Sequence, residues 1–362
     1  MSLLVFIAIL SILIIVHEWG HFITAKSLGV KVEKFSVGFG PKLFSTTKDG
    51  TEFMVCAIPM GGYVKMSGDE RSNCKGTPDE FYAHPVWHRA LIVLMGPIIN
   101  FVFAYLCFYA IFVTGFPMLS PTVGNVMEGY PAMTAGLLEG DRILRINQKE
   151  INGWDELQET IVGSGDESLL FGIERDGTEM TVPISPQQRV VKNIFGQEAK
   201  ISIVGIQPAG DITLLRYGVL ESFVKAYQEV VKIVSMTLKA VYHVVAGSMP
   251  AKDAFAGPIR IFDVIKDAVT EGIAYLLYIT AVISASLAIF NLFPVPVLDG
   301  GHLFFLLIEA VRRKPLPAKV EETLTKIGFS LLMCLMVFVL YNDFVEVGWL
   351  ENIIGFFKGL KG

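Results

Sequence analysis

The stretch IIVHEWGHFITA, residues 14–25, places two histidines and a glutamate in a run that is otherwise suited to lipid. Ionisable side chains cost about 2.5–3.5 kcal/mol each at the centre of a membrane helix, so they are rare there and mark functional sites. His17 and His21 are four residues apart and therefore share one face of a helix. The stretch predicts a helix that carries a polar site into the membrane.

The composition indicates an integral membrane protein with a soluble part. Of the 362 residues, 52% are apolar and only 18% are charged, against about 25% charged in an ordinary soluble domain. The net charge is −5 and no basic block is present, so we expect no nucleic-acid partner. The four cysteines have no C-x-x-C spacing and predict neither a disulfide framework nor a cysteine metal site.

Four segments are apolar enough to cross a bilayer, which takes about 20 residues. They lie at residues 1–24, 90–114, within 272–302, and at 324–342. The first has no basic leader and no cleavage site, so we expect a retained transmembrane helix. The predicted fold class is a polytopic α-helical membrane protein with about four transmembrane helices, an inserted α+β domain and a membrane-associated β-hairpin region.

The distribution of Lys and Arg predicts the orientation of these segments. Positive residues are frequent in two loops, 25–89 and 303–323, and short loops rich in such residues stay on the cytoplasmic side. We therefore expect the long segment between the second and third helices, and the tail 343–362, to lie outside the cytoplasm.

The first loop contains the run TEFMVCAIPMGGYVKM, which alternates around Gly61-Gly62. This pattern predicts a hairpin-like strand region with a glycine turn. Because the run is unusually apolar for a cytoplasmic loop, we expect it to enter the membrane against the helices; a surface hairpin is the alternative.

Residues 118–186 predict a compact soluble domain of short helices and strands. The run LLFGIERDGTEMTVPI reads as two strands joined at Asp176-Gly177. The preceding run PAMTAGLLEGDRILRINQ resembles a PDZ domain, with Gln148 in place of the usual glycine. Since PDZ domains bind extended peptides at a sheet edge, the resemblance implies either a peptide ligand or a role in blocking access. The segment 187–271 that follows contains an amphipathic helix at 217–246, suited to the outer membrane surface or to the soluble domain.

The opening stretch contains H-E-x-x-H, formed by His17, Glu18 and His21. On a helix both imidazoles can bind one Zn²⁺, and the glutamate beside them can act as general base on a water molecule. A pair of histidines that only form hydrogen bonds between helices is the alternative.

A third zinc ligand is expected from another membrane segment. The run NLFPVPVLDGGH, residues 291–302, contains Asp299, the only acidic residue of the third segment. Its prolines and glycines predict irregular backbone, which is tolerated at membrane depth only where it is buried in protein or lines a cavity. His302 is a rival ligand, and a helix-capping role for Asp299 is the structural alternative.

These motifs together resemble the RseP-type site-2 proteases, a family of bacterial intramembrane zinc metalloproteases. The resemblance covers HEWGH, GGYVKM, the PDZ-like run, GPIRI at 257–261 and NLFPVPVLDGGH. It implies that His17, His21 and Asp299 bind one Zn²⁺ per chain and that Glu18 is the catalytic base. It further implies substrate contacts by Asn291 and by the strand residues Gly61, Gly62, Tyr63, Val64, Lys65 and Met66.

The same resemblance implies the activity and its place in the cell. Such enzymes cleave transmembrane segments of single-span proteins, anti-sigma factors or remnant signal peptides, in regulated intramembrane proteolysis. We expect a multi-pass protein of the bacterial inner membrane, with its active site towards the cytoplasm and one PDZ domain outside. A non-proteolytic PDZ-bearing scaffold with a vestigial metal site is the competing interpretation; a zinc hydrolase of soluble peptides is less suited to ligands inside the bilayer.

Overall fold

The chain forms two compact units in a computed structural model that describes residues 2–71, 74–192 and 198–346. The helical unit comprises residues 1–109, 225–239 and 251–362, and the β unit comprises residues 110–224 and 240–250. Most of the predicted tail 343–362 lies outside the described residues.

Within the described residues, four helices are long and apolar enough to cross a membrane. They are α1 (Ser2–Ser27), α2 (Val86–Thr114), α8 (Ile273–Asn291) and α10 (Ala318–Glu346). Each overlaps one of the four segments predicted from hydropathy, which confirms the prediction of four such helices; α8 ends at Asn291, before residue 302, the predicted end of the third segment. Helix α10 begins before residue 324, the predicted start of the last segment.

Five further helices among the described residues contribute to the helical unit. They are η1 (Phe81–Ala83), α5 (Val219–Val245), α6 (Ala251–Ala254), α7 (Pro258–Glu271) and α9 (Asp299–Arg312). Of α5, only residues 225–239 belong to this unit. Residues 303–323, predicted as a cytoplasmic loop between two membrane spans, are mostly helical, because α9 and the first turn of α10 occupy most of them. Helix α9 is only 14 residues long, shorter than the stretch of about 20 apolar residues that indicates a membrane span in a sequence.

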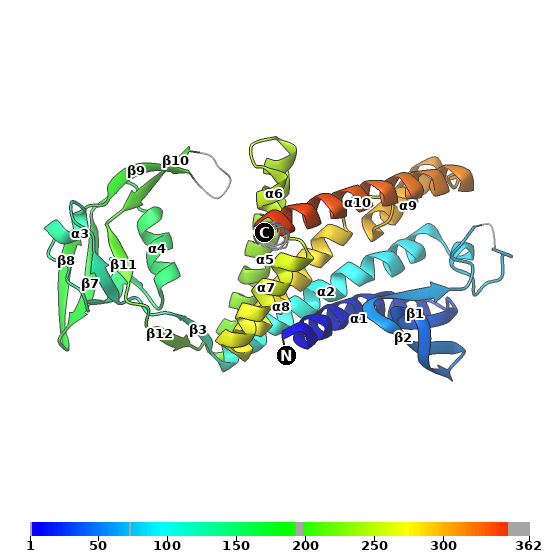
Figure 1. The fold of residues 1–362 in the computed structure, drawn as a ribbon, viewed down its shortest axis with the longest axis horizontal. Helices are drawn as coiled ribbons and strands as arrows, with labels where there is room; N and C mark the ends of the chain where they lie inside the picture. Colours follow the sequence, from blue (N-terminus) through cyan, green and yellow to red (C-terminus); the bar gives the residue numbers. More distant parts are fainter. Residues whose placement is uncertain (1, 72–73, 193–197, 347–362) are drawn as a thin grey trace, which may run out of the picture. The chain divides into compact units, whose positions relative to one another are not determined.

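One apolar cluster holds α1 against α7 and α8. Phe6, Ile9 and Leu13 of α1 are buried together with Ile265 of α7, and α8 adds partly buried residues such as Ile283. Helices α1 and α2 run beside each other in Figure 1, and Phe103 of α2 packs on the same cluster. The resulting bundle is the frame that carries the polar residues of α1.

Strands β1 (Val32–Lys48) and β2 (Thr51–Met66) follow α1. The turn between them is Asp49-Gly50, where both residues have positive φ, +50° and +76°. The prediction of a turn at Gly61-Gly62 is therefore wrong, since β2 continues through this pair. The glycines lie instead where β2 passes from one side of β1 to the other: Phe35 pairs with Phe53 on one side and with Val64 on the other.

Residues 62–66 consequently form an edge of this sheet. They pair with β1, and no second strand pairs with them among the described residues. A second apolar cluster, which contains Phe22 of α1, Phe35 of β1 and Ile92 of α2, holds the sheet on the helices. Ser11 of α1 also donates a hydrogen bond to the carbonyl oxygen of Pro59, at 2.7 Å.

A polar contact fixes α10 to the start of α7. The carboxylate of Asp343 accepts hydrogen bonds from the backbone N–H groups of Gly257, Ile259 and Arg260, at 3.1–3.3 Å. Asp343 is fully buried, and a Cβ at Gly257 would lie only 2.7 Å from its Cγ. Helix N-termini leave backbone donors unpaired, and here the neighbouring helix pairs them.

We expect Asp343→Ala to lower the free energy of unfolding by about 1–3 kcal/mol, because it leaves buried backbone donors without acceptors. Thermal unfolding of the purified protein in detergent measures this loss. Asn342→Ala is the neighbouring control, since its amide makes only a 3.5 Å contact with the carbonyl oxygen of Lys252. Equal melting temperatures for Asp343→Ala and Asn342→Ala would contradict the prediction.

The β unit contains the predicted strand–turn–strand pattern. Strands β5 (Arg142–Ile146), β6 (Lys149–Glu150), β7 (Leu169–Arg175) and β8 (Thr178–Ile184) form a sheet in the order β6-β5-β7-β8. The predicted turn at Asp176-Gly177 is confirmed, because Arg175 pairs with Thr178 across it. Two helices, α3 (Pro131–Thr134) and α4 (Trp154–Val162), belong to the same unit.

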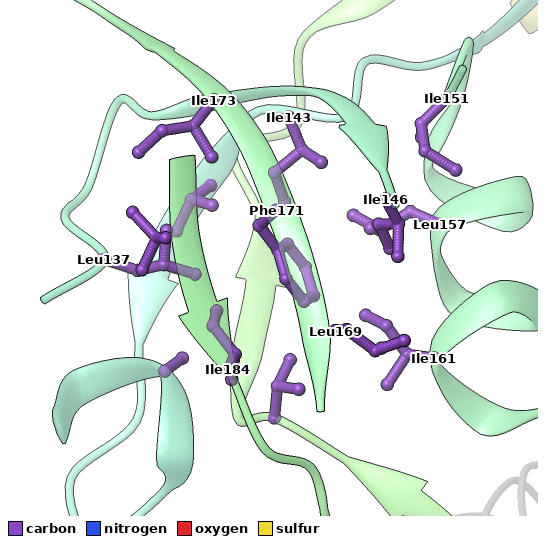
Figure 2. Close-up of a cluster of buried hydrophobic side chains, with 14 residues drawn as sticks. Leu137, Ile143, Ile146, Ile151, Leu157, Ile161, Leu169, Phe171, Ile173 and Ile184 are labelled. Atoms are coloured by element: carbon purple, nitrogen blue, oxygen red, sulfur yellow. The ribbon is translucent and has the colours of Figure 1, made fainter. Parts of the chain in front are cut away.

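Three further strand pairs extend the β unit beyond residue 186, its predicted end. They are β3 (Phe116–Leu119) with β12 (Ile212–Leu215), β4 (Val123–Val126) with β11 (Ile206–Pro208), and β9 (Gln187–Lys192) with β10 (Glu198–Ile203). Figure 2 shows the core, in which the ring of Phe171 points into a cluster with Leu157 and Ile161 of α4.

Candidate active site

The two histidines of α1 lie where α1 packs closely against α2. Both are buried, with 8% of their surface exposed. A Cβ at Gly96 of α2 would collide with the ring of His21 and lie 2.9 Å from Cε1 of His17. Glycine at this position therefore provides the space in which the two imidazoles sit.

Hydrogen bonds orient both rings. Nδ1 of His21 lies 2.8 Å from the carbonyl oxygen of Ile92. Because a carbonyl only accepts, Nδ1 carries the proton and Nε2 is left with a lone pair. Nδ1 of His17 lies 3.3 Å from the side-chain amide of Asn100, and the Nε2 atoms of the two histidines are 3.2 Å apart.

Asp299 joins the histidines from the far end of the sequence. It is the first residue of α9 and follows the non-helical segment 292–298. Its Oδ2 lies 3.1 Å from Nε2 of His17, and its Oδ1 lies 3.6 Å from Nε2 of His21. The Oδ2 atom is buried without a hydrogen bond of acceptable geometry among the described residues.

This donor set fits a single metal ion. One ligand atom from each of the three residues lies within 4.8 Å of the others. Two imidazoles and a carboxylate are a known catalytic zinc set, which leaves a fourth position open. A buried carboxylate oxygen without a partner is costly, and a cation at this point would pair it. His302, the rival ligand from the sequence, is not part of the group.

A cavity of about 600 Å³ opens beside the three residues. Glu18 lines it, one residue from His17, and so do Asn291 and His302. Its other lining residues come mainly from the edge of the sheet, the loop after it and the start of α9: Tyr63, Val64, Lys65, Met66, Asp69, Glu70, Phe81, Tyr82, Val93, Val297 and Leu298.

Five of the seven predicted substrate-binding residues thus line this cavity, and Gly61 and Gly62 do not. The two glycines lie at the bend of β2. Gly62 packs on α1, where a Cβ would meet Ile14 Cγ2 at 3.3 Å and Glu18 Cγ at 3.6 Å. Its contribution is to bring the edge strand close to the predicted base.

Asp69 and Glu70 of the segment after β2, and Phe81 and Tyr82 of η1, were not predicted at the site, since nothing in their local pattern distinguishes them from an ordinary connecting segment. Asn100 was also missed. It is a fully buried amide in an apolar helix, and its polarity within a predicted membrane segment was a usable signal.

An ion-pair network borders the same region. Glu309 of α9 binds Arg89 and Arg71, both at 2.6 Å, and Arg71 also binds Glu321 at 3.2 Å. Burial opposes ionisation of Glu309, but the hydrogen bonds from the two arginines outweigh it and lower its pKa. Burial and the charge of Glu321 raise the pKa of Tyr82 to about 12, so its hydroxyl stays protonated and donates to Glu321.

Comparison with known proteins supplies the family. Residues 5–335 match the sequence family described as peptidase family M50. The chain belongs to peptidase family M50. Membership confirms the family predicted from HEWGH and NLFPVPVLDGGH, and with it the prediction of an enzyme of the metalloendopeptidase class.

The relatives of this M50 peptidase match it almost end to end. Metalloprotease MmpA of Caulobacter vibrioides is 32% identical, covering 96% of this chain and 96% of the relative. A protein of Rhizobium meliloti named "Putative zinc metalloprotease" is 36% identical, over 95% and 96% of the two chains. One of the same name from Agrobacterium fabrum is 34% identical, over 93% and 94%.

Proposed function

We propose that this M50 peptidase is a zinc-dependent intramembrane endopeptidase, with one Zn²⁺ per chain, that hydrolyses peptide bonds within the transmembrane segments of single-span proteins. The observation that carries the proposal is the meeting of His17, His21 and Asp299 beside a cavity that has an open strand edge on its wall. Two of these ligands belong to a helix that is long and apolar enough to cross a membrane.

Different residues of the site bind the metal and transfer the proton. His17, His21 and Asp299 hold the ion, and a bound zinc ion supplies Lewis-acid activation of water and of the scissile carbonyl. Glu18 lies beside the ligands and lines the cavity. Its carboxylate takes a proton from the attacking water and transfers it to the leaving amine nitrogen, as a general acid–base residue does.

The wall of the cavity suits an unwound substrate. A peptide bond in a membrane helix is already hydrogen-bonded, so the helix must be unwound locally before attack. The N–H and C=O groups of the unwound backbone then need new hydrogen-bond partners away from bulk water. Residues 62–66 form a strand edge without a second partner among the described residues, and four of them line the cavity. The substrate backbone pairs with this edge as an added strand, and the Asn291 amide offers a further hydrogen bond.

Reconstitution tests the proposal directly. The purified enzyme and its Glu18→Gln variant are placed in vesicles with a panel of single-span proteins of the anti-sigma-factor and signal-peptide types. Mass spectrometry then locates the cut. We expect zinc-dependent cleavage inside the membrane segment by the wild type only; cleavage confined to soluble loops would overturn the proposal.

Asn291→Leu separates substrate binding from metal binding. Loss of one buried hydrogen bond costs about 1–3 kcal/mol, so we expect kcat/KM to fall about 5–150-fold while the zinc content of the purified protein stays unchanged. Steady-state kinetics and metal analysis give the two values. An unchanged kcat/KM for single-span substrates would remove Asn291 from the site.

We further propose that the β unit is a PDZ domain that binds an extended peptide. A groove of about 210 Å³ lies between α4 and β10, lined by Trp154, Leu157 and Ile161 on one side and by Ile201 and Ile203 on the other. Its apolar walls suit hydrophobic side chains, and β10 pairs only with β9 among the described strands. Binding of fluorescent apolar-ended peptides to wild type and not to Ile203→Glu tests this proposal.

The proposed location is the bacterial inner membrane, in which the chain is a multi-pass protein. Lys and Arg concentrate in residues 25–89, which supports placing this loop and the active site towards the cytoplasm and the β unit outside. Accessibility labelling of single cysteines introduced into residues 25–89 and into the β unit of a protein lacking its natural cysteines tests this orientation.

A further inference from the structure

Asn100 occupies a position that the proposed mechanism does not explain. It is a polar residue in the middle of α2, with no exposed surface. Its backbone carbonyl accepts a hydrogen bond from Ser284 of α8, at 2.9 Å. Its side-chain amide faces Nδ1 of His17, with Nδ2 at 3.3 Å.

In this orientation one polar atom of the Asn100 amide makes no hydrogen bond among the described residues. The Oδ1 atom of Asn100 is buried and has no hydrogen-bond partner among the described residues. A buried amide oxygen without a partner is costly. The other atom of the same amide touches the one ring nitrogen of His17 that does not face Asp299.

The orientation of this amide selects the tautomer of His17. When Nδ2 donates to Nδ1, the ring proton is on Nε2, which then faces Nε2 of His21 at 3.2 Å. When the amide is reversed, Oδ1 accepts a proton from Nδ1, and Nε2 presents a lone pair towards Asp299. Only the second tautomer can bind a metal through Nε2.

We propose that Asn100 is a positioning residue for the metal site: in the zinc-bound protein its Oδ1 accepts the Nδ1 proton of His17, which directs the Nε2 lone pair to the ion. The inference rests on the proposed metal-binding role of His17. Such outer partners of ligating histidines fix the tautomer and ring orientation, and their loss usually costs 10–100-fold in metal affinity.

Two isosteric variants and one matched control test the role. Asn100→Leu fills the space without a hydrogen bond, and Asn100→Asp retains only acceptor oxygens. Ser284→Ala removes the neighbouring contact between α2 and α8 without touching the His17 ring. Zinc dissociation constants are measured on purified protein by competition with a chelator, so the readout does not depend on proteolysis.

We expect Asn100→Leu to bind zinc about 10–100-fold more weakly, while Asn100→Asp and Ser284→Ala stay within a few-fold of wild type. Wild-type affinity in Asn100→Leu, or an equal loss in Ser284→Ala, would overturn the proposal. Undiminished zinc binding by His17→Ala would instead overturn the metal site of the proposed function, so the two failures are distinguishable.

The wild-type protein offers a second measurement that needs no change at Asn100. Nitrogen-15 NMR of ring-labelled histidine reports which nitrogen carries the proton, and the His17 signal is assigned by its loss in His17→Gln. We expect a protonated, hydrogen-bonded Nδ1 in the zinc-loaded protein. A zinc-loaded His17 with its proton absent from Nδ1 would refute the positioning role.

Discussion

Replacing Glu18 by glutamine is expected to lower the rate of substrate cleavage by about 10²–10⁴-fold, the usual contribution of a general acid–base residue. Glutamine keeps the shape of the side chain but cannot accept a proton from water. Because Glu18 lines the cavity and is not one of the three grouped metal ligands, the zinc content should equal that of the wild type. Cleavage of a reconstituted single-span substrate, with metal analysis of the same sample, gives both quantities.

The matched control is Glu139→Gln, at an exposed position of the β unit. It makes the same chemical change far from the cavity in sequence and should leave the cleavage rate unaltered. Wild-type cleavage by Glu18→Gln would remove Glu18 from its role as base. Loss of zinc together with activity would show that the residue serves the metal and not the proton transfer.

Asp299→Asn is expected to weaken zinc binding by more than about 100-fold, since it removes the only charged ligand, whereas loss of an outer partner already costs 10–100-fold. The two imidazoles that remain are neutral when they bind a metal. The zinc that stays bound after dialysis against a weak chelator measures the change, and excess zinc should restore part of the cleavage.

His302→Gln provides the comparison for Asp299→Asn. His302 lines the same cavity and lies three residues along α9, but its ring is outside the ligand group. It should retain zinc as the wild type does. A protein that keeps its zinc after Asp299→Asn and loses it after His302→Gln would assign the third ligand to the histidine.

The three grouped ligands could be predicted from the sequence because each is marked by a pattern within a short stretch of residues. His17 and His21 share a helix face through their spacing alone, and Asp299 is the only acidic residue in its apolar segment. The four long apolar helices followed from hydropathy in the same way. In each case one short stretch carries the signal, and no knowledge of a distant partner is needed.

The rest depends on partners that are far apart in the chain. The bend at Gly61-Gly62 resembles a turn locally, but a hairpin already closes at Asp49-Gly50 and β1 has room for a strand on each side. The pairing of Arg89 with Glu309 joins residues 220 positions apart. The contact of Asn100 with His17 exists only because α2 packs against α1.

The order in which the site residues appear along the chain has a consequence for biosynthesis. The imidazoles lie on α1, whereas the carboxylate that completes the group stands 278 positions after His21 (299 − 21). A growing polypeptide therefore cannot bring the three ligands together until Asp299, the first residue of α9, has been synthesised. A nascent chain that ends before residue 299 holds the two imidazoles but lacks the carboxylate of the group.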